Sequence, residues 1–144
     1  MLDSECMYCT KNEALLNIMI PICDVDGFPL YLNRNQTYRG RTILAYDNHT
    51  GKIADMEMKR GAEFFSAVQK VTKAITEVFN PRQINLGTFG DKMCHVHFHI
   101  VPKYEGGVDF GGVFQMNPQP EVRLNEEEYD EMIKSIRESL QNQK

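Results

Sequence analysis

Apolar residues in the first third of the chain are grouped into short runs that predict extended strands. Residues 18–33 form two such runs on either side of Asp26-Gly27, a dipeptide typical of tight hairpin turns. A polar connection follows, and residues 41–47 (RTILAYD) form the next apolar run. We therefore expect a hairpin followed by a third strand.

A long helix is predicted over residues 55–79, where apolar side chains recur every three or four positions. Asp55 is the candidate N-cap, and Asn80-Pro81 should end the helix, because the residue before a proline disfavours helical geometry. The expected buried face consists of Ala62, Phe65, Val68, Thr72, Ile75 and Phe79.

The second half of the chain predicts two further strands, a loop and a helix. Residues 83–90 read as a short strand ending in a glycine-containing loop, and residues 94–104 as a strand with strict alternation. Residues 105–120 hold four glycines and two prolines, so we expect a loop there. The charged C-terminal segment predicts an amphipathic helix over 125–144, with an inner face formed by Tyr129, Ile133 and Ile136. Without repeats or a linker, the pattern fits one α+β domain over residues 1–144, dominated by antiparallel strands.

Composition narrows the possible partners and locations. The chain has 144 residues, of which 42% are hydrophobic and 25% charged, as in an ordinary globular protein with a real core. Its net charge of -4 argues against binding to nucleic acid, but a small phosphate ligand needs only a few local donors. We see neither a signal peptide nor an apolar run near the roughly 18 residues that span a bilayer. We therefore expect no membrane association.

The four cysteines do not have the regular spacing of a secreted disulfide scaffold. Cys6 and Cys9 form a C-x-x-C pair, whereas Cys23 and Cys94 lie in apolar runs and are expected to be buried thiols. A reducing cytoplasm is the location that this pattern favours.

Three of the four histidines occupy alternate positions of one predicted strand and should share a face. His95 and His99 would lie roughly 13 Å apart along the strand, whereas zinc–nitrogen bonds measure about 2.0–2.1 Å. One ion therefore cannot readily bind all three histidines. A neutral imidazole such as that of His97 is also a good nucleophile near pH 7. From the residues alone, packing, metal binding and catalysis all remain open, although three aligned imidazoles disfavour packing.

The sequence HVHFHIV (residues 95–101) resembles the His-φ-His-φ-His-φ-φ signature, φ apolar, of the histidine triad (HIT) family of nucleotide hydrolases and transferases. Other features of the chain are similar to the family as well. These features are the spacing of Asn33, Gly40 and His49, the Asn85-Leu-Gly87 segment, the long helix and Pro102-Lys103. The resemblance covers roughly residues 6–104, and the segment 105–144 adds nothing to it.

The resemblance implies a HIT-like fold, with a mainly antiparallel sheet of about five strands, one long central helix and a C-terminal helix. It implies that His97 attacks the α-phosphorus of a nucleotide to give a nucleotidyl-histidine intermediate. His99 would then donate to phosphate oxygens, and His95 would orient the strand. Asn33 matches a ribose- or phosphate-binding position, and Asn85 a position near the leaving group.

The family resemblance also suggests the partners of the chain. The candidate substrates are nucleoside phosphoramidates, adenylylated amines and dinucleoside polyphosphates. No catalytic cofactor is expected, and relatives are commonly homodimers.

Two segments depart from the family pattern. Gly90-Asp91-Lys92 stands where a hydroxyl residue often assists the leaving group, so Lys92 is either a cationic substitute or a solvated loop lysine. The segment GRTILAYDNH (residues 40–49) replaces the usual Gly-His. These departures keep an alternative open: a catalytically weak nucleotide-binding or zinc-stabilised interaction protein.

The cysteine pair has zinc-knuckle spacing, but on its own it supplies only two ligands, and two free thiols remain an alternative. Many bacterial relatives that the chain resembles complete a structural zinc site with the isolated histidine and the first triad histidine. The matching residues are Cys6, Cys9, His49 and His95, which makes structural zinc the implied cofactor. A metal-dependent hydrolase that uses His95 and His97 as ligands is a further alternative.

Overall fold

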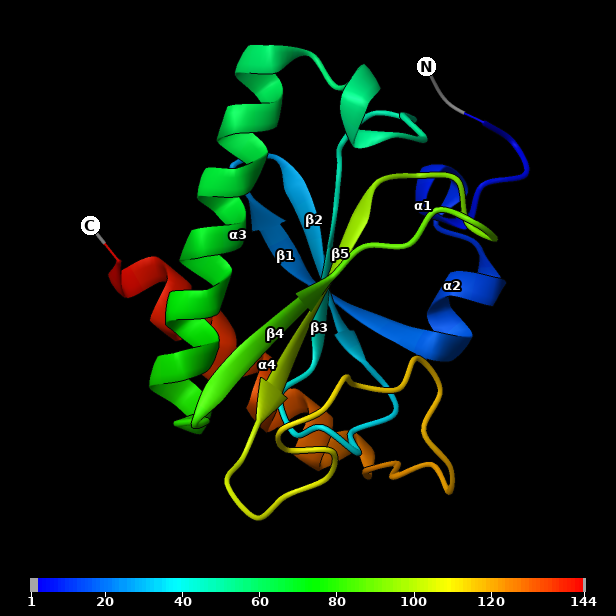
Figure 1. Cartoon of the computed structure of the whole chain (residues 1–144). Coiled ribbons are helices and arrows are strands. Elements are labelled where there is room, and N and C mark those ends of the chain that lie inside the picture. The colour runs from blue at the N-terminus through cyan, green and yellow to red at the C-terminus, as the bar shows by residue number, and fades with distance from the viewer. Residues whose placement is uncertain (1–2, 144) are drawn as a thin grey trace.

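Five antiparallel strands form one sheet at the centre of the computed structural model, which describes residues 3–143 (Figure 1). Neighbouring strands are all antiparallel. In spatial order the strands are β1 (Met19–Val25), β2 (Phe28–Asn33), β3 (Thr42–Ala45), β5 (His97–Lys103) and β4 (Gln83–Gly87). The predicted α+β class with a mainly antiparallel five-stranded sheet is confirmed.

Two long helices cover one face of the sheet, and two short helices lie on the other side (Figure 1). The long helices are α3 (Met58–Phe79) and α4 (Glu126–Asn142), and the short ones are α1 (Met7–Thr10) and α2 (Glu13–Ile18). A single 3₁₀ turn, η1 (Ile53–Asp55), precedes α3. None of the helices in residues 3–143 has the length and hydropathy of a membrane-crossing segment.

The β1–β2 hairpin follows directly from its turn sequence. Asp26 and Gly27 have φ values of 53° and 89°, the left-handed geometry that type I′ turns require at both central positions. Phe28 then pairs with Val25 across the turn. The predicted hairpin is confirmed.

Strand β5 separates the main core from the histidine face. Phe98 and Ile100 pack into the core between the sheet and the two long helices, together with Leu44 and Phe64. Because neighbouring side chains alternate, His97 and His99 point to the opposite face. The regular strand begins at His97, so His95 lies just before it rather than inside it.

The boundary and buried face of α3 differ from the prediction. Glu57, not Asp55, is the N-cap, and its carboxylate accepts hydrogen bonds from the backbone N–H groups of Lys59 and Arg60. Ala62 and Phe65 are exposed. The periodicity gave too much weight to Phe65, because small residues complete the real inner stripe, which is formed by Gly61, Phe64, Ala67, Val68, Val71, Ala74 and Ile75.

The C-terminal helix matches expectation more closely, whereas the two cysteines outside the C-x-x-C pair do not. Helix α4 buries Tyr129, Ile133 and Ile136 as predicted. Cys23 is only half-buried and Cys94 is exposed, so the prediction of two buried thiols was wrong. Cys94 is exposed because it lies in the bend before β5, where strand alternation has not yet begun.

Candidate functional site

A cavity of about 520 Å³ opens on the histidine face of the sheet. Its floor includes His97 and His99 from β5 and Arg41, which immediately precedes β3, and its walls include Tyr8 from α1 and Met116 from the loop between β5 and α4. The lining is mostly apolar with a few polar groups at its base, as in sites for small molecules.

His97 is held in one orientation by two contacts. Its Nδ1–H donates a hydrogen bond to the backbone carbonyl of His95 at 2.6 Å. The Tyr8 ring stacks on the imidazole, with 4.8 Å between ring centroids and 29° between planes. Burial lowers the pKa of His97, so the ring is neutral near pH 7. With Nδ1 protonated, Nε2 carries the free lone pair that a nucleophile requires.

His99 lies beside His97, with 5.2 Å between the ring centroids. Its Nδ1 is 3.1 Å from Nη2 of Arg41. Burial, and then the positive charge of Arg41, lower the pKa of His99 to about 3. The two histidines therefore form a neutral pair at the base of the cavity.

Cys6, Cys9, His49 and His95 converge beside the cavity, with their donor atoms all within 4.8 Å of one another. The Cys6 Sγ–His95 Nδ1 and Cys9 Sγ–His49 Nδ1 distances are both 3.4 Å, and Cys9 Sγ lies 3.6 Å from His95 Nδ1. In a tetrahedral zinc site, with bonds of about 2.3 Å to sulfur and 2.0–2.1 Å to nitrogen, such atoms lie about 3.5 Å apart. The four residues fit a Cys₂His₂ metal site.

Outer contacts direct both histidines of this cluster toward the cysteines. His95 Nε2 lies 2.7 Å from the backbone carbonyl of Tyr46, so Nε2 carries the proton and Nδ1 is free to bind a metal. His49 Nε2 lies 3.5 Å from a carboxylate oxygen of Asp3. Metal-binding histidines commonly use their second nitrogen in this way.

The substrate-binding residues expected from the sequence occupy different places. Asn33, at the end of β2, and Lys92 line the cavity. The Asn33 amide donates to the backbone carbonyl of Asn35 at 3.1 Å, and Lys92 is exposed at the rim. Asn85 pairs with Val101 in the β4–β5 ladder and is not part of the cavity lining. The structure thus joins two of the three residues to the histidine pair.

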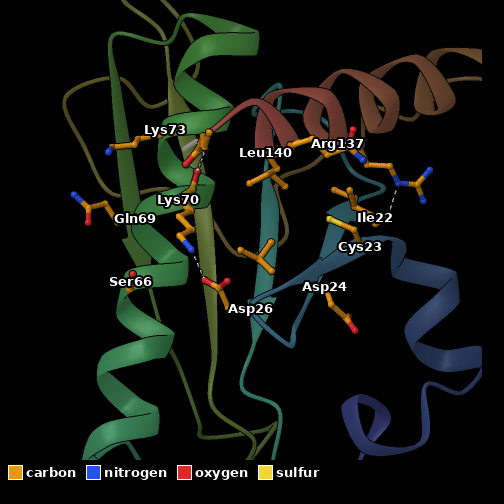
Figure 2. A pocket seen from close by; sticks show the side chains of 13 residues that line it. Ile22, Cys23, Asp24, Asp26, Ser66, Gln69, Lys70, Lys73, Arg137 and Leu140 are labelled. Carbon is orange, nitrogen blue, oxygen red and sulfur yellow. Dashed lines mark hydrogen bonds and ion pairs between the residues drawn. The ribbon is translucent and has the colours of Figure 1, made fainter.

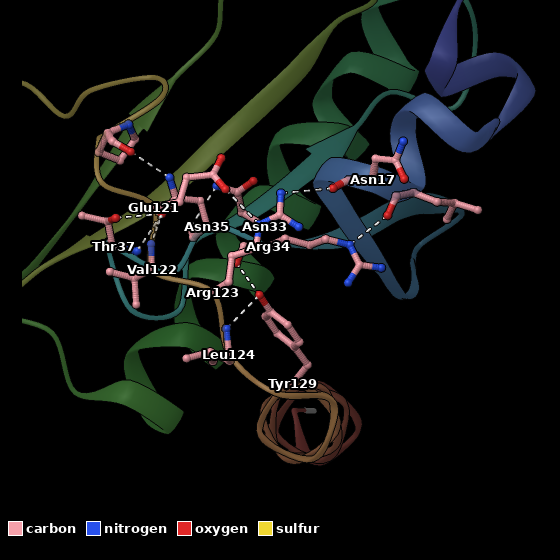
Figure 3. Close-up of polar contacts among 12 residues, drawn as sticks. Asn17, Asn33, Arg34, Asn35, Thr37, Glu121, Val122, Arg123, Leu124 and Tyr129 are labelled. Atoms are coloured by element: carbon pink, nitrogen blue, oxygen red, sulfur yellow. Dashed lines mark hydrogen bonds and ion pairs between the residues drawn. The ribbon is translucent and has the colours of Figure 1, made fainter.

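The segment 113–124 completes the cavity because polar contacts fix it to the β2–β3 connection (Figure 3). The Asn35 amide donates to the carbonyl of Pro118 at 3.0 Å, and its oxygen accepts from the N–H of Val122 at 3.2 Å. Tyr129 donates to the carbonyl of Arg34 and accepts from the N–H of Leu124. These contacts hold the peptide that carries Met116 against the histidine face.

A second cavity, of about 650 Å³, lies between the β1–β2 hairpin, α3 and the end of α4, away from the histidines (Figure 2). The Lys70 ammonium in it forms an ion pair with Asp26 at 2.7 Å, and the Arg137 Nε–H donates to the carbonyl of Ile22 at 2.6 Å. None of the described residues that line this cavity is a histidine, so it offers no arrangement comparable to the histidine pair.

Tyr8 and Arg41 are site residues that the sequence did not reveal. Both are buried, at 4% and 1% exposure, and both contact a triad histidine. Tyr8 was hidden inside the C-x-x-C pair, and Arg41 at the start of an apolar run. The one available signal for Arg41 was an arginine beside an apolar strand run, because a charged residue in such a place is rarely buried without a partner.

Comparison with known proteins agrees with this geometry. The model of the HIT domain matches residues 22–106, which is more than half of the chain. The chain belongs to the HIT family. The resemblance inferred from the triad motif is thereby confirmed.

Relatives of this HIT protein include Protein hit from Bacillus subtilis, which is 28% identical over 120 residues, covering 76% of this chain and 83% of that protein. The adenosine 5'-monophosphoramidase hnt1 of Schizosaccharomyces pombe is 31% identical over 102 residues, covering 67% of this chain and 76% of the yeast protein.

Solved structures share the fold at low sequence identity. A histidine triad protein from Bradyrhizobium japonicum has a TM-score of 0.81 and 17% identity, covering 90% of this chain and 96% of that one. A Zn-bound histidine triad family protein from Mycobacterium smegmatis has a TM-score of 0.64 and 19% identity, covering 95% and 94%.

Proposed function

We propose that the protein is a nucleotide hydrolase or nucleotidyltransferase that cleaves a bond at the α-phosphate of a nucleotide. One observation carries the proposal: His97 is neutral and its Nδ1 is bound to the His95 carbonyl, so Nε2 is left as a nucleophile in the cavity. Activation through the second ring nitrogen is what nucleophilic catalysis by histidine requires.

The reaction has two steps. His97 Nε2 attacks the α-phosphorus, the bond from phosphorus to the leaving group breaks, and the leaving group takes up a proton from solvent. Water then attacks the nucleotidyl-histidine and gives up a proton to solvent, the phosphorus–Nε2 bond breaks, and a nucleoside monophosphate is released. His99 donates a hydrogen bond to a phosphoryl oxygen and stabilises the charge that develops there. The chemistry calls for no catalytic cofactor.

We infer a substrate from three classes: nucleoside phosphoramidates, adenylylated amines and dinucleoside polyphosphates. Similarity to a relative named as an adenosine 5'-monophosphoramidase makes the phosphoramidate the first to test. Asn33 is proposed to bind ribose or phosphate and Lys92 the leaving-group side, since both line the cavity. Asn85 is also retained as a proposed contact near the leaving group, on the basis of family resemblance alone.

We propose a structural zinc ion held by Cys6, Cys9, His49 and His95, supported by their spacing and by the Zn-bound structural relative. Zinc would tie α1 to the chain that leads into β5, so its proposed role is structural. His97 is not needed as a ligand, which disfavours a metal-dependent hydrolase built on His95 and His97.

The remaining proposals concern the state of the whole molecule. We propose a homodimer of single-domain chains spanning residues 1–144, in the cytoplasm. Within residues 3–143, β4 pairs only with β5 and so forms an edge of the sheet, where it exposes Leu86; the free side of an edge strand is a ready site for a second chain. Light scattering coupled to gel filtration measures the oligomeric state.

The decisive experiment uses adenosine 5'-phosphoramidate with the wild-type protein, His97→Ala and His97→Gly. We expect AMP release by the wild type and, after acid quenching, a peptide containing His97 that carries an adenylyl group. Both variants should lose turnover, and added imidazole should restore part of it to His97→Gly by occupying the vacated space. Wild-type turnover in either variant would refute His97 as the nucleophile.

The alternative is a nucleotide-binding or zinc-stabilised interaction protein with little turnover. The segment Gly90-Asp91-Lys92 favours it, because it lacks the hydroxyl that the family often has there, although Asp91 and Lys92 line the cavity. In that case AMP would bind, but neither AMP release nor an adduct would be detected for any of the three substrate classes.

A further inference from the structure

Arg41 is a buried cation whose charge is not neutralised by the protein. Its side chain is 1% exposed, and within residues 3–143 it forms no ion pair with a carboxylate. Its Nε–H is buried without a hydrogen-bond partner. Burial lowers the pKa of Arg41 to about 10, so the guanidinium remains charged near pH 7. A buried and uncompensated charge is costly, and it favours a bound anion nearby.

The contacts of Arg41 with Gln115, Met116 and Phe114 hold it beside the histidine pair. Nη1 donates to the backbone carbonyl of Gln115 at 3.2 Å, and Nη2 donates to the Met116 sulfur at 3.4 Å. The planar group also lies 5.3 Å from the centroid of the Phe114 ring. These contacts fix the guanidinium beside His99.

The hydrogen bond between Arg41 and His99 determines where the His99 proton resides. A guanidinium has only donors, so at 3.1 Å the His99 Nδ1 must be the acceptor. The neutral ring then carries its proton on Nε2, which has no protein hydrogen-bond partner within residues 3–143. The adjacent positive charge also makes this Nε2–H a stronger donor.

We propose that Arg41 is a positioning and specificity-determining residue, which holds His99 as an Nε2–H donor and makes the cavity selective for a ligand that carries a phosphate anion. The identity of the ligand in this inference rests on the proposed function, whereas the protonation state of His99 does not. Arg41 acts through His99 and through its charge, while His97 remains the group that attacks phosphorus.

The state of His99 is tested first in the ligand-free wild-type protein. Long-range ¹H–¹⁵N correlation spectra near pH 7 distinguish protonated from unprotonated ring nitrogens. We expect Nε2 of His99 to be protonated and Nδ1 to be unprotonated. A His99 signal with the proton on Nδ1, or a doubly protonated ring, would overturn the proposal without any reference to turnover.

Selectivity is tested by calorimetric affinities for AMP and for adenosine in the wild type and in three Arg41 variants. Arg41→Lys keeps the charge, Arg41→Gln keeps a donor, and Arg41→Met keeps neither. We expect the preference for AMP over adenosine to fall about 10- to 100-fold in the Gln and Met variants, as for loss of a charged hydrogen bond, and to be largely kept in Arg41→Lys. Arg39→Gln, which alters an exposed arginine two residues away, is the matched control and should keep the wild-type preference.

The outcomes separate the two proposals. Loss of AMP preference in Arg41→Met, with a wild-type preference in Arg39→Gln, supports the role of Arg41 even if the wild type hydrolyses no phosphoramidate. An unchanged preference in a folded Arg41→Met, or no preference for AMP in the wild type, overturns the selectivity. If the Arg41 variants do not fold, the wild-type spectrum and the wild-type AMP preference decide.

Discussion

Replacing Cys9 with serine should lower turnover at His97, although Cys9 takes no part in the chemistry. The proposed zinc ion links Cys9 to His95, and the backbone carbonyl of His95 accepts the Nδ1–H of His97. Cys6 and Cys9 also flank Tyr8, whose ring stacks on His97, the proposed nucleophile. Weakening the metal site therefore removes the support of His97 from two sides.

The size of the effect follows from these two contacts. A neutral hydrogen bond contributes about 1 kcal/mol, and a stacked aromatic pair about 1 kcal/mol. Losing both raises the barrier by about 2 kcal/mol, which is about a 30-fold fall in kcat/KM. The fold itself should survive, because the main core between the sheet and the long helices does not include this cluster.

The assay combines elemental analysis for bound zinc with AMP release from adenosine 5'-phosphoramidate. Cys23→Ser is the matched control, because Cys23 is also a half-buried free cysteine but lies in β1, outside the metal cluster. We expect zinc and turnover to fall together in Cys9→Ser and neither to change in Cys23→Ser. Unchanged stoichiometric zinc in Cys9→Ser would refute the metal site, and zinc loss with wild-type kcat/KM would refute its link to the nucleophile.

Three further predictions concern Tyr8, His99 and Gly40. Tyr8→Ala should lower the free energy of unfolding by about 3 kcal/mol and reduce turnover, because it removes the buried ring that stacks on His97. Tyr8→Phe keeps the ring and should retain both properties. Urea unfolding and the AMP-release assay measure them, and wild-type stability and turnover in Tyr8→Ala would contradict the stacking argument. The pKa of His99 is about 3 in the folded protein against 6.5 when exposed, so the unfolded chain binds the extra proton and stability falls as pH decreases from 6.5 toward 3. His99 contributes about 1.4 kcal/mol per pH unit to the slope of the free energy of unfolding against pH. Between about pH 6 and about pH 5, urea unfolding should therefore show a smaller loss of stability for His99→Gln than for the wild type. Equal slopes in the two proteins would refute the lowered pKa of His99. Gly40 and Gly111 have nearly the same φ, 91° and 92°, but a Cβ on Gly40 would lie 2.7 Å from the Phe79 ring, while one on Gly111 meets no atom within 4 Å. Gly111→Ala should therefore lower the free energy of unfolding by about 1 kcal/mol through backbone strain, and Gly40→Ala should lower it clearly more. Equal decreases in melting temperature for the two variants would argue against a clash between a Cβ at position 40 and the Phe79 ring.

The strand order, the triad and the metal cluster differ in how far the sequence could predict them. Alternation in β5 predicted that Phe98 and Ile100 face the core, because strand geometry is local. The four candidate metal ligands were assigned by family resemblance, because no local pattern relates Cys6 to His49 and His95, which lie 43 and 89 positions away. Arg41 could not be assigned to His99 at all, because that contact depends on how β3 and β5 pair and on where the C-terminal loop lies.

The α3 helix shows a different limit. Its existence was clear from periodicity, but Phe65 was assigned to the core, whereas the real stripe uses Gly61 and Ala67. Small residues carry little weight in a hydrophobic pattern, yet they let a helix approach a sheet closely. Which of two adjacent stripes of α3 is buried depends on the shape of the sheet against which the helix packs, and the sequence of the helix alone does not contain that information.

Part of the wall of the histidine cavity comes from outside the stretch of chain that matches the family domain. The domain match ends at residue 106 and begins at residue 22, while Met7, Tyr8, Ile18 and Met19 precede it and Met116 and Asn117 follow it. The shape of the cavity therefore depends on segments at both ends of the chain as well as on the family domain that carries His97 and His99. Exchanging one short peptide, residues 113–118, between members of the family would change the wall formed by Met116 and Asn117 while His97 stays untouched.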